Sequence, residues 1–121
     1  MSLSVRINFP NSLLLVLDPV LGVVPNVLES GLVTATPTAL AIGTTAEPDA
    51  PTLVVMCARS DLPHAATLTC AWRGVVETAG TLAVTSVEGS VYLATPARRQ
   101  CSMEVWANDL DEPSEVWLAL A

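Results

Sequence analysis

Five carboxylates near the end of the chain form its densest group of side chains capable of acid–base chemistry: Glu104, Asp109, Asp111, Glu112 and Glu115. Two such groups on either side of a sugar bond can hydrolyse a glycoside. However, Asp109, Asp111 and Glu112 fall in one short polar segment, where charged side chains are most often simply solvated. We therefore predict an acidic recognition patch rather than a catalytic pair, one that steers binding towards a basic partner.

The single histidine, His64, follows Asp61 and Cys57 along the chain. These residue types suggest a metal site or a pair of nucleophile and base. A metal needs three or four ligands, and no second histidine is present to supply one. Cys57 lies in a run that predicts a buried strand. We therefore expect His64 to be an exposed loop residue, and we predict no catalytic residue, no metal site and no cofactor.

Arg98 and Arg99 are adjacent and follow a strand-like run. A pair of arginines suggests a clamp for an anionic ligand. The glycine-rich loop or helix N-terminus that often completes such a clamp is missing from this part of the sequence. We therefore expect both side chains to pair with nearby carboxylates.

The chain has no lysine, and its five arginines are outnumbered by twelve acidic residues, which gives a net charge of −7. Such a chain cannot neutralise a row of phosphates, so binding to nucleic acid is not expected. The missing lysine also excludes Schiff-base catalysis and a phosphate-binding P-loop. An enzyme is the class of protein that we expect least.

Three tryptophans are candidates for an interface or for the core. Trp72 alternates in phase with Leu68 and Cys70, which favours a place in the core. Trp106 and Trp117 alternate out of phase with the most apolar residues of their own runs, so both point to the other face. If the last two strands pair, these two indoles share one surface, where they could form a sugar platform, a partner anchor or part of the core.

The elements that must position these residues are short strands. Val, Thr and Leu are abundant, and turn signals recur every eight to twelve residues, a pattern typical of an all-β sandwich. The run from Thr52 to Ala58 is apolar on both faces, which predicts a central strand of a sheet. Gly74 separates a strand over 67–73 from a short one over 75–78. We predict a single domain over residues 1–121, built from two packed antiparallel sheets of eight or nine strands in total.

Composition bears on the surroundings of the protein. Only 14% of residues are charged, against roughly a quarter in typical domains. Either a second copy covers part of the apolar surface, as in a homodimer, or abundant Ala and Val merely raise the hydropathy of a monomer. The three cysteines are widely spaced and suggest reduced core residues. No run is long enough to cross a membrane and Asp18-Pro19 interrupts the one leader-like segment, so we expect a cytoplasmic protein.

The stretch from Thr95 to Leu120 resembles the closing hairpin of small bacterial β-sandwich proteins similar to competence protein J. A proline-led strand of alternating residues runs into an acidic loop and then into a final apolar strand, and the preceding Glu88-Gly89 turn fits the same layout. The sequence departs from that layout at Cys101 and Met103, where an aromatic and a basic residue are expected. The named member inhibits a DNA-uptake nuclease, and the resemblance implies that Asp109, Asp111 and Glu112 face a partner.

These observations predict a non-enzymatic protein-binding module, in its most specific form an acidic nuclease inhibitor or immunity-type protein. Its partner would be a basic protein such as a nuclease or a toxin. The predicted partner-binding residues are Glu104, Trp106, Asp109, Asp111, Glu112 and Trp117. Two alternatives stay open: a sandwich that binds a small ligand or carbohydrate through exposed indoles, and a structural or assembly subunit.

Overall fold

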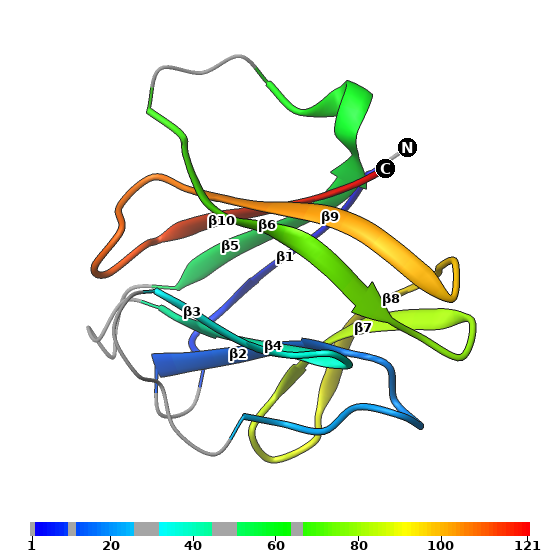
Figure 1. Ribbon diagram of the computed structural model, residues 1–121. Helices are drawn as coiled ribbons and strands as arrows, with labels where there is room; N and C mark the ends of the chain where they lie inside the picture. The colour runs from blue at the N-terminus through cyan, green and yellow to red at the C-terminus, as the bar shows by residue number, and fades with distance from the viewer. Residues whose placement is uncertain (1, 10–11, 26–31, 45–50, 64–66) are drawn as a thin grey trace.

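Short alternating runs and frequent turns build a chain of β-strands that pack as two layers (Figure 1). The computed structural model describes residues 2–9, 12–25, 32–44, 51–63 and 67–121. These residues form ten strands in two five-stranded sheets. The predicted two-sheet β-sandwich is confirmed, and the number of strands is ten rather than eight or nine.

The first sheet has the strand order β1-β5-β10-β9-β6. Every neighbouring pair in it is antiparallel except β5 and β10, which run parallel. The bounds are β1 (Ser2–Ile7), β5 (Thr52–Ala58), β10 (Glu115–Leu120), β9 (Gln100–Ala107) and β6 (Thr69–Glu77).

The second sheet has the order β3-β4-β2-β7-β8 and is antiparallel throughout. Its strands are β3 (Val33–Thr36), β4 (Ala39–Gly43), β2 (Leu13–Leu17), β7 (Thr81–Ser86) and β8 (Val91–Pro96).

The main hydrophobic core lies between the sheets and takes residues from both. The second sheet contributes Leu14 and Leu40, and the first contributes Val54, Met103 and Leu118. We call the face of the first sheet that packs on this core its inner face, and the opposite face its outer face. Because successive side chains of a strand point to opposite sides, the neighbours of these residues lie on the outer face.

Strand β5 lies between β1 and β10 and is covered on both faces, as predicted. Val54 and Met56 belong to the main core. On the outer face, Val55 and Cys57 form a second buried cluster, against which Leu62 and Trp117 pack. The 3₁₀ turn η2 (Arg59–Asp61) leads from β5 into the segment that carries Leu62. This segment stands on the outer side of the first sheet (Figure 1).

Strand β6 differs from the sequence-based prediction in its length and in its alternation. Gly74 does not separate two strands, because β6 is continuous from Thr69 to Glu77. The ring of Trp72 packs beside Gly74, where an added Cβ would lie 2.6 Å from Cζ2 of the indole.

An irregularity between Cys70 and Trp72 also shifts the register of β6 against β9, so that these two residues pair with the consecutive residues Trp106 and Val105. A β-bulge of this kind breaks the simple alternation predicted for this run. Trp72 packs against the main core, as predicted.

A buried carboxylate joins the end of β2 to a distant turn. Asp18, which ends β2 as predicted, accepts hydrogen bonds at Oδ1 from the backbone N–H groups of Val20 (2.7 Å) and Leu21 (2.8 Å). Its Oδ2 accepts the N–H of Ala79, at 2.6 Å, from the β6–β7 turn. These N–H groups, Leu21 first, hold the pKa of Asp18 below its usual value.

The three cysteines are free thiols. Cys57 and Cys101 are buried, in agreement with the prediction of core residues, and Cys70 is partly buried. No helix in the described part of the chain is long and apolar enough to cross a membrane.

Candidate functional site

The same three residues, Glu-Val-Trp, occur on both strands of the β9–β10 hairpin, as Glu104-Val105-Trp106 and Glu115-Val116-Trp117. The central valines are fully buried in the main core. The flanking residues therefore lie on the outer face of the first sheet. Trp106 is directly opposite Trp117 in the antiparallel ladder, so the hairpin brings the two predicted indoles together.

Each indole is held by the glutamate two residues before it. Trp106 donates its N–H to Glu104 Oε1 at 3.1 Å, and Trp117 donates its N–H to Glu115 Oε1 at 2.7 Å. Both tryptophans are partly buried. Their polar atoms are thus satisfied within the protein, while part of each ring remains accessible.

Glu104 is the anchor of this arrangement rather than a displayed charge. Only 7% of the residue is exposed. Arg73 Nε donates to Glu104 Oε2 at 2.7 Å, and Arg59 Nε lies 3.8 Å from Oε1. The hydrogen bond from Trp106, followed by the two arginines, outweighs burial and lowers the pKa of this carboxyl group. Glu104 therefore positions Trp106, and its predicted contact with a partner stays a prediction.

The segment between β9 and β10 is an acidic turn with a fixed backbone. Asp109 Oδ1 accepts the N–H groups of Asp111 (2.7 Å) and Glu112 (3.1 Å), and these bonds lower the pKa of Asp109. Asn108 Oδ1 accepts the N–H groups of Ser114 and Glu115, both at 3.1 Å. Local side-chain bonds of this kind close a turn without help from the sheet.

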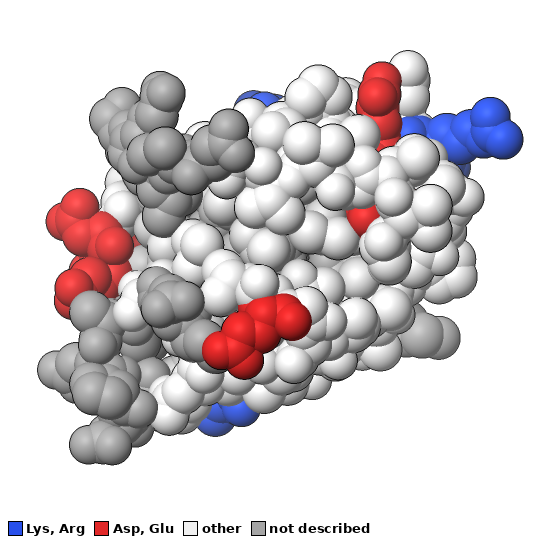
Figure 2. Space-filling view, turned by 90° about the horizontal axis from the view of Figure 1, so that it is seen from below, with Lys and Arg blue, Asp and Glu red and all other residues white. Residues whose placement is uncertain are grey.

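This turn displays its charges at one end of the molecule. Asp109, Asp111 and Glu112 are all exposed. Acidic atoms gather at the left edge of Figure 2, on the side where the β9–β10 turn lies in Figure 1, with no basic atom beside them in that view. Among the described residues, the ion pairs of the chain involve Glu104 and not these three carboxylates. We call Trp106, Asp109, Asp111, Glu112 and Trp117 the hairpin end.

The other candidates for chemistry lie only partly within the described residues. His64 lies outside the described residues. Burial raises the pKa of Cys57, and the nearby Asp61 adds to this effect. A nucleophilic cysteine needs the opposite shift. Within the described residues, no three His, Cys, Asp or Glu side chains come together in a group that could hold a metal ion.

Several apolar side chains are exposed where the chain leaves β2: Val20, Leu21, Val23 and Val24, with Val20 83% exposed. Their backbone is held by Asp18 and by Thr38, whose Oγ1 accepts the N–H of Val23 at 2.9 Å. A second copy that covered these side chains would agree with the homodimer alternative drawn from the composition. The homodimer itself stays a prediction.

Sequence reasoning missed Arg59 and Arg73, which belong to this region through Glu104. No local pattern links residues 31 positions apart, as Arg73 and Glu104 are. The repeated Glu-Val-Trp was a readable signal, since it places a carboxylate and an indole on the same face of each strand. Comparisons of the chain with models of protein families, with curated proteins and with solved structures yield no match.

Proposed function

We propose that this chain is a non-enzymatic protein-binding module that engages a basic partner through the hairpin end. The observation that carries the proposal is the juxtaposition of three exposed carboxylates, on a turn with a fixed backbone, with two partly exposed tryptophans on the same hairpin. Aromatic residues are frequent anchors of protein interfaces, and a surface charge of one sign favours a partner of the opposite sign.

The carboxylates orient a basic partner and raise the rate at which it associates. Their side chains have no arginine partner among the described residues. No nearby positive charge therefore cancels the negative electrostatic potential of the three carboxylates. A field of one sign attracts a basic surface and raises the rate of encounter, an effect that salt weakens. Because hydrogen bonds fix the turn beforehand, binding costs little ordering entropy.

The tryptophans supply the buried contact. A partner that covers an indole normally has to satisfy or displace its N–H donor, since a buried unpaired donor is costly. Here Glu104 and Glu115 already accept both donors. A partner can therefore cover the exposed part of each ring with apolar atoms alone.

In its most specific form the module is a nuclease inhibitor or immunity-type protein. A nuclease holds phosphates with a cluster of basic residues, and the three carboxylates of the hairpin end would occupy that cluster in place of the nucleic acid. The resemblance of residues 95–120 to proteins similar to competence protein J supports this form.

Two other functions have less support. A sugar platform uses polar groups around an aromatic ring to bind hydroxyls, and both indole donors are already engaged within this chain. An assembly subunit is supported by the exposed apolar residues after β2, but their exposure alone does not identify what they contact.

The test uses a basic protein recovered from the native lysate on the immobilised chain, then purified. Its affinity is measured by calorimetry at low and high salt for the wild type and for the triple variant Asp109→Asn, Asp111→Asn, Glu112→Gln. The Asn at 109 keeps an oxygen that can accept the two backbone N–H groups. We expect binding to weaken on the order of tenfold at low salt and its salt dependence to flatten.

Glu88→Gln is the matched control, because Glu88 is exposed in the β7–β8 turn and should not change the affinity. If the triple variant binds as the wild type does, with the same salt dependence, the hairpin end is not the interface. If the recovered partner is a nuclease, its activity should fall as the chain is added and should return with the triple variant.

A further inference from the structure

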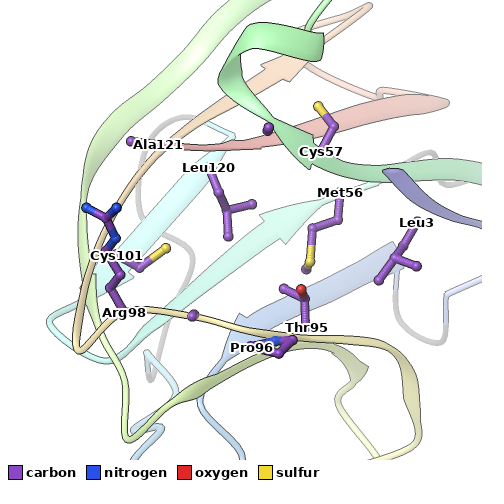
Figure 3. A pocket seen from close by; sticks show the side chains of 11 residues that line it. Leu3, Met56, Cys57, Thr95, Pro96, Arg98, Cys101, Leu120 and Ala121 are labelled. Carbon is purple, nitrogen blue, oxygen red and sulfur yellow. The ribbon is translucent and has the colours of Figure 1, made fainter. Parts of the chain in front are cut away.

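A cavity of about 510 Å³ lies at the end of β10 opposite to the acidic turn. Its walls come from both sheets, from β1, β5, β9 and β10 on one side and from the end of β8 on the other. In Figure 3 the side chains of Leu3, Met56 and Leu120 point into one space, with Thr95 and Cys101 across from them. The volume falls in the range of roughly 300–1,000 Å³ that is typical of small-molecule sites.

The side chains in the walls of this cavity are mostly apolar, and none of them is acidic. None of its 11 lining residues is acidic, although the chain has twelve acidic residues. Burial raises the pKa of Cys101, which is therefore a neutral thiol in this wall. The interior thus suits a hydrocarbon group, and no acidic side chain in its wall would repel an anion.

Arg98 is the one residue in the lining of the cavity that has a charged side chain. It is exposed, and no carboxylate forms an ion pair with it among the described residues. The expected pairing of Arg98 with a nearby carboxylate is therefore not seen among the described residues. Its backbone is fixed, because Arg98 O accepts the Thr78 hydroxyl at 2.8 Å and Ala97 donates its N–H to Gly80 O at 2.9 Å.

A guanidinium on a fixed backbone beside an apolar cavity suits a ligand that has an anionic group and a hydrocarbon chain. Arginine binds carboxylates through charge-assisted hydrogen bonds, often two at once. The apolar walls gain free energy by covering a hydrocarbon chain. The glycine-rich loop expected of an anion clamp is not needed here, because the cavity supplies most of the contact.

We propose that this cavity binds a monocarboxylate with an unbranched hydrocarbon tail, such as a medium-chain fatty acid. The tail lies among Leu3, Met56 and Leu120, and the carboxylate pairs with Arg98. This site does not rest on the proposed function, since it shares no residue with the hairpin end. No bond is made or broken, so the activity is binding alone.

The test is calorimetric titration of the full chain with hexanoate, octanoate and decanoate, and with octanamide as a neutral analogue of the same length as octanoate. Each added methylene that enters the cavity should tighten binding about three- to fourfold. Arg98→Gln should weaken the binding of octanoate at least tenfold and leave the binding of octanamide unchanged. Arg99→Gln is the matched control and should bind like the wild type, because Arg99 does not line the cavity.

A second variant fills the cavity without touching the arginine. Ala97→Phe should abolish the binding of all four compounds, whereas Ala35→Phe, on the exposed side of β3, should not. Circular dichroism of each variant shows whether it is folded. Absence of saturable binding of every carboxylate to the wild type overturns the proposal. Binding that persists unchanged in both Arg98→Gln and Ala97→Phe overturns it as well, because the ligand then lies elsewhere.

Discussion

Trp106 and Trp117 lie directly opposite each other on β9 and β10, and each donates its indole N–H to the glutamate two residues before it. The two glutamates differ in what else they bind. Glu104 is buried and paired with arginine, while Glu115 is only partly buried. Glu104 therefore links the β9–β10 hairpin to β6 through Arg73 and to η2 through Arg59. The contribution of this link to stability can be measured.

Replacing Glu104 by Gln should destabilise the protein by about 1 kcal/mol, because the buried Glu104 loses its charge while the solvent-exposed Arg73 and Arg59 are screened by water. Chemical denaturation in urea measures the change in the free energy of unfolding. The matched control is Glu88→Gln at an exposed turn, which should stay within about 0.5 kcal/mol of the wild type. Equal stabilities of the two variants would show that Glu104 is not an anchor.

Asp18 should make the stability of the protein depend on pH at the acid end. Its pKa is lowered in the folded state from the ordinary 3.8 by backbone N–H groups, Leu21 first. Its contribution is therefore present above the ordinary value and is lost as the pH falls through the lowered one. Urea unfolding from neutral pH down to about pH 3 measures this slope. Asp18→Asn should be less stable at neutral pH and should show a shallower acid slope. An acid slope identical to that of the wild type would contradict the assignment.

Gly74→Ala should destabilise β6, because a Cβ there would lie 2.6 Å and 2.7 Å from two ring carbons of Trp72. The indole packs against the main core, so its displacement should cost about 1–2 kcal/mol even after the gain from a less flexible unfolded chain. Thermal unfolding and tryptophan emission report the loss and the movement of the ring. Gly43→Ala is the control, since its Cβ would meet its nearest neighbour at an ordinary 3.6 Å. A stabilised Gly74→Ala would rule out the close approach.

The three thiols should react with a disulfide reagent at different rates. Cys70 is partly exposed, whereas Cys57 and Cys101 are buried and burial raises the pKa of both. At mildly alkaline pH we expect one fast equivalent and two slow ones, since the thiolate is the reactive form. Absorbance of the released thiol measures the rates, and Cys70→Ser should remove the fast phase. Two or more fast equivalents in the wild type would contradict the buried positions.

The alternation of apolar and polar residues along the chain was enough to predict much of this fold. The two-sheet sandwich, the doubly covered β5 and the outward positions of Trp106 and Trp117 all follow from which side of a strand each residue faces. That information is local, because successive side chains of a strand point to opposite sides whatever the strand pairs with. The acidic turn was likewise visible as a short run of polar residues between two apolar strands.

Strand pairing between distant segments decided the rest. The sequence contains no sign that β10 lies parallel to β5, that the register of β6 shifts before Trp72, or that Arg73 reaches Glu104. These depend on which strands become neighbours, and many pairings satisfy the same alternation. The burial of Glu104 and the cavity beside Arg98 exist only once both sheets are assembled, since each is formed by residues far apart in the chain. The sequence thus determined the type of fold and the faces of its strands, and the tertiary structure decided which of its charges are exposed and where a cavity forms.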